Sequence, residues 1–213
     1  MKLDPPRVNP PSLVDLDDAT GDDLARGTDC QRIEGATVAG LRVGAADFRE
    51  SELVDVRISG SELRDCRFLD VRFERLDAPD LGAPASTWRD CEIVESRIGS
   101  IGLFDAKIGS VRFAHCKIGY LGLQGAAVAD VSFEECTIEE LELSEGSLTR
   151  ARFPGTTIAD LRLTGARLSH TDLREARLGL VSPVSALRGA TVSSSQLIDL
   201  APAFAAQLGI RVD

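Results

Sequence analysis

Large apolar residues recur at every fifth position over most of this chain. From Ile33 to Leu178, the fifth positions hold Ile, Val, Leu, Phe or Trp everywhere except at Ala78 and Ala83. A helix would repeat near every 3.6 residues and a strand at every second residue, so neither element explains this spacing. The pattern predicts a solenoid in which the chain turns a corner every five residues.

A second inward position lies two residues before each large one. It is held mainly by small or apolar residues, such as Ala46, Cys66, Ala106 and Cys136, and is almost never charged. The other three positions of each unit carry nearly all the Arg, Glu, Asp, Lys and Gly. Each unit therefore divides into two inward and three outward side chains, which a chain that bends every five residues can accommodate.

The five-residue units resemble those of the pentapeptide repeat proteins. Segments such as ADFRE, SELRD, CRFLD, VRFER, ARLSH and TDLRE are similar to the A(D/N)LXX unit of that family, and about thirty units follow one frame. The resemblance implies an all-β fold, a right-handed quadrilateral β-helix with four pentapeptides per coil, so that residues twenty apart stack. The repeat region is expected over residues 33–181.

Residues twenty apart provide a separate test of that stacking. Phe73, Phe113, Phe133 and Phe153 are separated by multiples of twenty and are expected to share one internal column. At roughly 4.8 Å per coil, opposite charges in an outward row would also lie directly above one another, each exposed pair stabilising by about 0–1 kcal/mol. One such row largely alternates in charge: Arg32, Glu52, Arg72, Glu92, Arg112, Ser132, Arg152 and Asp172.

The segment DAPDLGAPAS, residues 77–86, interrupts the regular pattern. It places alanine where large residues belong and adds Pro79 and Pro84, which lack the amide donor of a strand ladder. Quinolone-resistance members of the family carry functional loops that leave the coil, so a loop is one interpretation. The stacking of Phe73 with Phe113 favours the other interpretation, in which the segment remains in the coil and forms a part of it with a narrower core.

The N-terminal residues 1–32 differ in kind from the repeat. They contain two pairs of prolines, then acidic residues with scattered leucines at Leu13, Leu16 and Leu24. Because an open β-helix exposes unpaired backbone groups at its ends, we expect this segment to cap the first coil, with the three leucines lying on it. A disordered tail is the alternative.

The C-terminal residues 182–213 also leave the five-residue frame. Ser194 is expected to cap a short helix through Leu200, and Pro202 to begin a second helix that ends at Gly209. Residues 210–212 are expected to add a last strand. The tail resembles the terminal helix of the mycobacterial fluoroquinolone-resistance pentapeptide repeat proteins, where such a segment mediates dimerisation. Two roles are open for the apolar face of this tail: it pairs two copies of the chain, or it caps the last coil. The face is formed by Leu197, Leu200, Phe204 and Leu208.

Composition narrows the class of partner. The net charge of -10 and the isoelectric point of about 4.8 argue against direct binding of a phosphate backbone and favour basic protein surfaces. The chain holds no run of eighteen apolar residues, and its start, MKLDPPRVNPP, has no apolar signal core, so a cytoplasmic location is expected. Four of the five cysteines occupy the small inward position, which is typical of core filler.

Three outward features are candidate binding surfaces. An acidic run that includes Glu134 and Glu135 lies between Lys117 and Arg150, without any Lys or Arg inside it. Two outward aromatic residues lie in the glycine-rich segment 97–123, where they would form a docking surface or be ordinary outward residues: Phe104 and Tyr120. A row of carboxylates at twenty-residue spacing could present charge at regular intervals, as DNA does, or be a solvated face: Glu50, Asp70, Asp90 and Asp130.

Catalysis is not indicated by any motif in the sequence. The two histidines, His115 and His170, occupy outward repeat positions without an identifiable nucleophile, and the glycines recur at repeat offsets rather than in a phosphate-binding loop. We therefore expect no catalytic, metal or cofactor site.

The leading hypothesis is a non-enzymatic acidic rod that binds a basic protein. Resemblance to the quinolone-resistance branch implies DNA gyrase or another type II topoisomerase as partner, with the rod standing in for DNA. The alternative is a structural scaffold or interaction module for an unrelated protein.

Overall fold

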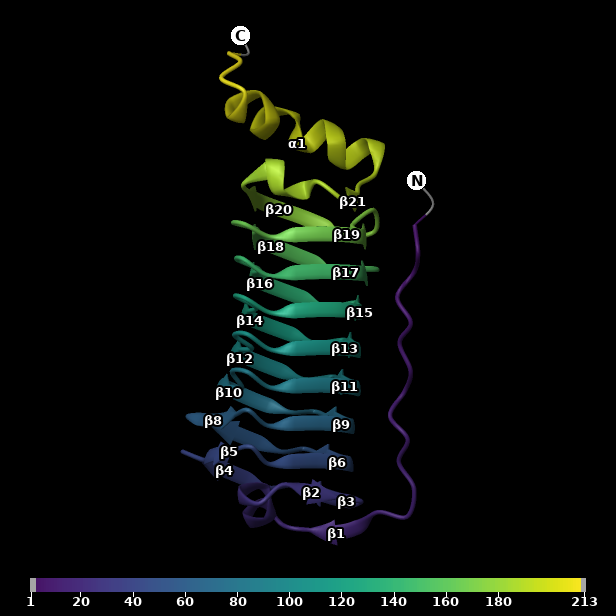
Figure 1. Ribbon diagram of the computed structural model, residues 1–213, viewed down its shortest axis with the longest axis vertical. Coiled ribbons are helices and arrows are strands. Elements are labelled where there is room, and N and C mark those ends of the chain that lie inside the picture. Colours follow the sequence, from purple (N-terminus) through teal and green to yellow (C-terminus); the bar gives the residue numbers. More distant parts are fainter. Residues whose placement is uncertain (1–2, 212–213) are drawn as a thin grey trace.

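Each five-residue unit of the sequence forms one wall of a four-sided coil. The computed structural model describes residues 3–211, and the coils stack into a β-solenoid of about eight turns (Figure 1). Residues twenty apart pair in parallel register, as Phe68 does with Trp88 and Trp88 with Ile108. The fold expected from the repeat is therefore confirmed.

Two parallel sheets, which we call sheet A and sheet B, form the walls. Sheet A contains β1 (Asp17–Ala19), β2 (Thr28–Asp29), β3 (Gln31–Glu34), β6 (Asp47–Val54), β9 (Arg67–Glu74), β11 (Thr87–Val94), β13 (Lys107–Ala114), β15 (Ala127–Glu134), β17 (Ser147–Arg152), β19 (Arg167–Asp172) and β21 (Ala190–Thr191). Sheet B contains β4 (Thr37–Ala39), β5 (Arg42–Gly44), β7 (Arg57–Ser59), β8 (Ser61–Arg64), β10 (Asp77–Gly82), β12 (Arg97–Gly102), β14 (Lys117–Gly122), β16 (Thr137–Glu142), β18 (Thr157–Arg162) and β20 (Arg177–Ser182).

Many corners of the solenoid require a left-handed backbone. Among residues 3–211, nineteen residues other than glycine have a positive φ, and all of them lie at multiples of five. Asp is the most frequent of these residues, as at Asp70 (φ 56°) and Asp90 (φ 52°). Because Asp and Asn tolerate this conformation better than most side chains, the corner geometry itself favours aspartate there.

The interior consists of columns of stacked side chains. The rings of Phe113, Phe133 and Phe153 lie 4.7 Å and 5.1 Å apart and are almost parallel. Phe73 belongs to the same column, separated from Phe113 by Ile93. The shared column expected from the sequence is thus confirmed, and each fully buried ring contributes about 1.5–3 kcal/mol of burial energy.

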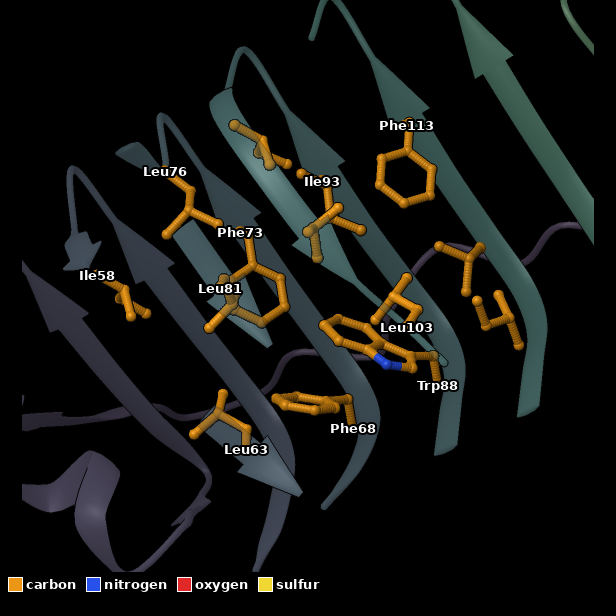
Figure 2. A pocket seen from close by; sticks show the side chains of 14 residues that line it. Ile58, Leu63, Phe68, Phe73, Leu76, Leu81, Trp88, Ile93, Leu103 and Phe113 are labelled. Atoms are coloured by element: carbon orange, nitrogen blue, oxygen red, sulfur yellow. The ribbon is translucent and has the colours of Figure 1, made fainter. Parts of the chain in front are cut away.

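Residues 77–86 remain within the coil. β10 pairs with β12 in register, and Ala78 and Ala83 are fully buried. In the same region Trp88 supplies a large ring, which stacks 4.0 Å from that of Phe68 and lies 5.8 Å from that of Phe73 (Figure 2). Small and large residues therefore compensate one another, and an apolar cavity of only about 20 Å³ is left.

One helix closes the C-terminal end of the solenoid. After the 3-10 turn η2 (Val184–Leu187), α1 (Ser194–Gln207) begins at the N-cap Ser193 and continues through Pro202, so the expected pair of helices is wrong. Continuation of the helix keeps Leu200 and Phe204 packed against the last coil. Residues 210–211 form no strand, and Val212 lies outside the described residues.

The N-terminal segment has two parts. β1 pairs with β3, and Leu24, in the 3-10 turn η1 (Gly21–Ala25), is buried at the first coil. Residues 3–16, which we call the arm, instead run extended along the outside of the solenoid toward its far end (Figure 1). Leu13 and Leu16 belong to the arm and are only half-buried. Across residues 3–211, no helix has both the length and the apolar character needed to cross a bilayer.

Candidate partner-binding surfaces

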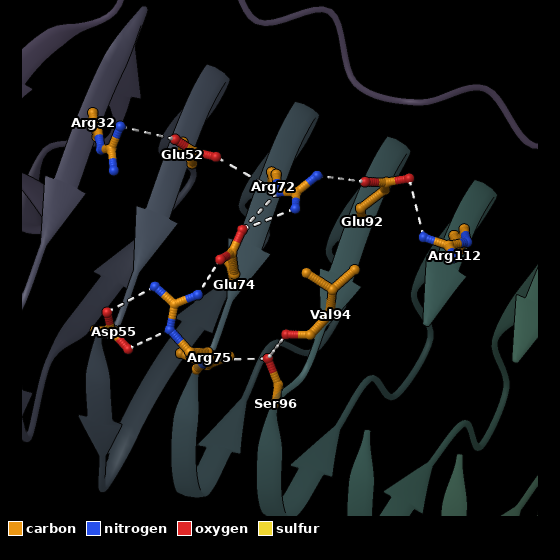
Figure 3. Close-up of polar contacts among 11 residues, drawn as sticks. Arg32, Glu52, Asp55, Arg72, Glu74, Arg75, Glu92, Val94, Ser96 and Arg112 are labelled. Atoms are coloured by element: carbon orange, nitrogen blue, oxygen red, sulfur yellow. Dashed lines mark hydrogen bonds and ion pairs between the residues drawn. The ribbon is translucent and has the colours of Figure 1, made fainter. Parts of the chain in front are cut away.

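Charges on sheet A form a ladder that neutralises this side of the rod. Glu52 lies 3.8 Å from Arg32 and 3.5 Å from Arg72, and Glu92 lies 3.2 Å from Arg72 and 3.5 Å from Arg112 (Figure 3). The alternation expected for this row is confirmed from Arg32 to Arg112. Because each of these carboxylates lies between two guanidinium groups, this wall has little acidic potential to offer a partner.

One corner of sheet A carries a polar row with one residue per coil. We call it the polar corner row, and it consists of Cys30, Glu50, Asp70, Asp90, Ser110, Asp130, Arg150 and His170. All eight have a positive φ. The structure thus places the four carboxylates that the sequence singled out at twenty-residue spacing at equivalent corners of their coils.

The arm lies along this row and bonds to it through its backbone. The N–H of Arg7 donates to Asp130 Oδ1 at 3.0 Å, and the N–H of Ser12 donates to Asp70 Oδ1 at 2.9 Å. The Asn9 side-chain amide donates to Asp90 Oδ1 at 3.1 Å. Three of the four carboxylates are therefore already bonded to the arm.

Two uncharged acceptors extend the same contact. The N–H of Asn9 donates to Ser110 Oγ at 2.9 Å, and the N–H of Asp4 donates to His170 Nδ1 at 3.1 Å. These bonds account for Ser110, which interrupts the acidic row in the sequence, because its hydroxyl group accepts a bond from the arm as the carboxylates do. Five of the eight residues of the row therefore accept bonds from the arm, and two of these five are uncharged side chains.

Asp130 is the most strongly held carboxylate of the row. Arg150 Nε and Nη2 donate to its two oxygens at 2.6 Å and 2.7 Å. These bonds, with a smaller contribution from the N–H of Arg7, lower the pKa of Asp130 below its usual value of 3.8. The side chain remains ionised well into the acid range and keeps this contact of the arm in place.

The opposite corner, on sheet B, carries the two aromatic residues. A Cβ at Gly102 would lie 2.9 Å from the ring of Phe104, and one at Gly122 would lie 2.8 Å from Phe104 and 2.7 Å from Tyr120. Glycine leaves room for both rings to lie against the wall. Phe104 remains 39% exposed, so part of its ring is available to a partner.

Tyr120 connects these rings to the acidic run. Its hydroxyl group donates to Glu142 Oε2 at 2.9 Å and accepts from Gln124 Nε2 at 2.6 Å. Burial, reinforced by the carboxylate of Glu142, raises the pKa of Tyr120. The aromatic and acidic candidate surfaces are therefore neighbours on sheet B.

Some carboxylates of the acidic run are neutralised. Glu134 lies 2.9 Å from Arg112 and 2.7 Å from Arg152, and Glu140 lies 2.6 Å from Arg162. Other carboxylates on β16 and its flanking corners form no ion pair with any residue in the range 3–211. We call this group the acidic belt, and it consists of Glu135, Glu139, Glu142 and Glu145.

The apolar face expected on the C-terminal helix is divided. Leu200 is buried against the solenoid and Phe204 is partly buried there. Leu197 and Leu208 are 53% and 75% exposed, and the sequence did not single out the equally exposed Ile198 at 73%. Two of the four residues therefore cap the last coil, while the other two face outward.

A family model supports the repeat, and two solved structures are similar to the chain. Residues 143–179 match the family model of pentapeptide repeats in eight copies, and no curated protein matches the chain. A trypsin-treated form of QnrB1, a plasmid-mediated fluoroquinolone resistance protein, is similar over 93% of this chain and 98% of its own, at 19% identity and a TM-score of 0.39. HetL, a pentapeptide repeat protein involved in heterocyst differentiation regulation in the cyanobacterium Nostoc, is similar over 78% of this chain and 84% of its own, at 15% identity and a TM-score of 0.32.

Proposed function

We propose that this chain, a solenoid of pentapeptide repeats, is a non-enzymatic protein that binds a basic partner through sheet B. The observation that supports the proposal is the acidic belt, whose carboxylates form no ion pair within residues 3–211 and which includes Glu142, bonded to Tyr120 beside the half-exposed ring of Phe104. Carboxylates attract the Lys and Arg of a partner, and an aromatic ring adds apolar contact and a cation–π site. The binding surface is thus the side of the rod away from the arm.

Charge density limits the extent to which the rod imitates DNA. Duplex DNA carries one charge per about 1.7 Å of axis. A net charge of -10 over about eight coils of roughly 4.8 Å gives only one charge per about 4 Å. The four carboxylates of the acidic belt lie within 11 consecutive residues, about half of one coil, so they are spread around the rod rather than along its axis. The belt is therefore a local acidic cluster and does not reproduce the axial charge spacing of a duplex.

We further propose that the partner is DNA gyrase or another type II topoisomerase. Such an enzyme holds duplex DNA on a basic surface, to which a local cluster of carboxylates would also be attracted. The resemblance of the sequence to the quinolone-resistance branch supports the same partner. The belt would then compete with DNA for the enzyme.

Supercoiling by purified gyrase tests this proposal. The wild-type protein at micromolar concentration is expected to alter supercoiling, and the variant Glu139→Lys/Glu145→Lys to lose that effect. The matched control Asp18→Lys/Glu95→Lys makes the same change in charge at exposed positions outside the belt and is expected to retain the effect. No effect of the wild-type protein, or equal effects of both variants, would contradict the proposal.

A second candidate function is supported by the exposed ring of Phe104. A scaffold that binds a protein unrelated to DNA would depend on this ring and on Tyr120 more than on charge. Salt dependence separates the two functions, because binding through the belt weakens steeply as ionic strength rises while apolar contact does not. A partner whose affinity falls on Phe104→Ala but not with added salt would favour the scaffold.

We also propose that the outward residues of α1 pair two copies of the chain. Leu197, Ile198 and Leu208 are more than half exposed, and the helix holds only one charged residue, Asp199. Sedimentation of the Leu197→Glu/Leu208→Glu variant is expected to show a monomer while the wild-type protein sediments as a dimer. A wild-type monomer at high concentration would overturn this proposal, leaving Leu200 and Phe204 as a cap alone.

A further inference from the structure

We propose that the polar corner row is a second binding track, distinct from sheet B, which accepts an extended proline-rich segment of another protein. The arm is the built-in ligand of this track and shows how the segment would bind. It contacts Asp70, Asp90, Ser110, Asp130 and His170 over a distance of five coils. The proposal is independent of the partner assigned to the acidic belt.

Recognition on this track depends mainly on the backbone of the ligand. Four of the five bonds come from backbone N–H groups, those of Asp4, Arg7, Asn9 and Ser12. The residues between them include the proline pairs 5–6 and 10–11, which have no N–H to leave unsatisfied. A ligand therefore needs donors at a few positions and tolerates proline at the others.

The spacing of the row matches an extended proline-rich chain. Three residues of a polyproline II helix advance about 9.3 Å, and two coils advance about 9.6 Å. The donors follow this rule at both ends of the arm. Asp4 and Arg7 reach acceptors two coils apart, and so do Asn9 and Ser12.

The arm is held in a way that permits exchange. None of residues 3–16 is buried, so no apolar side chain anchors the arm in the solenoid core. Ordering its non-proline residues costs conformational entropy of the same order as its exposed hydrogen bonds recover. A segment of another protein with the same donor spacing can therefore replace the arm, at the cost of competing with a ligand tethered at high local concentration.

Fluorescence anisotropy with a labelled peptide tests the track on the full-length protein. The probe is LDPPRVNPPSL, the sequence of residues 3–13. The receptor is the full chain with Arg7→Pro/Asn9→Pro/Ser12→Pro, which removes three backbone donors of the arm and leaves the solenoid unchanged. This receptor is expected to bind the probe at least tenfold more tightly than the wild-type protein does, since the competing arm is weakened.

Two controls locate the binding to the row. A probe with proline at the three donor positions is expected not to bind. Asp70→Asn/Asp130→Asn, added to the receptor, is expected to weaken binding about tenfold, because charged acceptors form stronger bonds than neutral ones. The matched variant Asp65→Asn/Asp105→Asn changes the same residue type at another row of left-handed corners and is expected to bind like the receptor.

Each result decides the question. Equal binding of the two probes would overturn the proposal, and so would equal losses of affinity in the two Asp→Asn variants. Either result would show that the row does not bind the backbone N–H groups of the probe. Circular dichroism of every variant verifies that the solenoid is folded. A weakened response confined to the row variant would support the assignment.

Discussion

Ala83→Leu is the substitution for which the repeat pattern and the three-dimensional packing give opposite expectations. Leucine at this position would complete the column of large residues that includes Leu63 and Leu103. The pattern alone therefore predicts greater stability. In the structure Ala83 is fully buried, and the core cavity lined by Leu63, Trp88 and Leu103 measures only about 20 Å³, which is room for about one water-sized sphere and not for three more carbon atoms.

The structure predicts that Ala83→Leu destabilises the protein. Overpacking of a close-packed core costs about 1–3 kcal/mol, and the ladder bonds of the coils on either side restrict relaxation of the backbone. The indole of Trp88 is connected to this position, because it donates to Ser86 Oγ at 2.8 Å, and that hydroxyl group in turn donates to the carbonyl oxygen of Ala83 at 2.5 Å. Reducing this indole should restore the space.

A double-mutant cycle in urea measures this compensation. Ala83→Leu/Trp88→Leu is expected to be more stable than the sum of the two single losses by about 0.5–3 kcal/mol. Ala159→Leu, at an exposed wall position, controls for the change of residue and is expected within about 0.5 kcal/mol of the wild type. A higher urea midpoint for Ala83→Leu, or strict additivity in the cycle, would refute the reasoning.

Three further outcomes follow from the core, the ion pairs and the thiols. Phe133→Ala, which removes a ring stacked on both sides, is expected to cost about 3–5 kcal/mol in urea unfolding, while Phe104→Ala costs less than about 1 kcal/mol. The lowered pKa of Asp130 means that the stability from its ion pair is fully present above the unfolded value of 3.8 and is lost as pH falls through the folded value, so Arg150→Met is expected to reduce the stability lost between about pH 6 and pH 2. Burial raises the pKa of Cys91 to about 12, so a thiol reagent near pH 8 is expected to modify only the one cysteine that is not buried, and all five after denaturation.

The solenoid could be predicted from the sequence because its information is redundant. About thirty units repeat one environment, so two alanines or an added proline do not change the frame. Stacking of Phe113 on Phe133 and pairing of Arg72 with Glu92 both follow from the twenty-residue offset. The same offset places Gly102 and Gly122 one above the other. These two glycines were a sequence signal for the space on the wall in which the ring of Phe104 lies.

The ends could not be predicted in this way. The path of the arm depends on backbone N–H groups of residues such as Arg7 and Ser12, which no side-chain pattern records. Its prolines indicated an extended chain but not the surface on which it lies. In α1, the local preference for a new helix at Pro202 was outweighed because Leu200 and Phe204 both gain contact with the last coil when one helix continues.

The position of a carboxylate on the coil helps to decide whether the fold or a partner explains it. Asp70 and Asp130 occupy left-handed corners that favour aspartate, and both accept bonds from the arm, so the structure accounts for them without a partner. Glu139 and Glu142 lie on a wall where the previous coil carries Gly119 and Gly122, and no backbone requirement calls for glutamate there. Glu145 is at a left-handed corner, but its longer side chain is not among those that this conformation favours. Because the fold does not require these charges, we propose a binding partner for them, and a basic protein should be sought at the acidic belt rather than at the more regular row of aspartates.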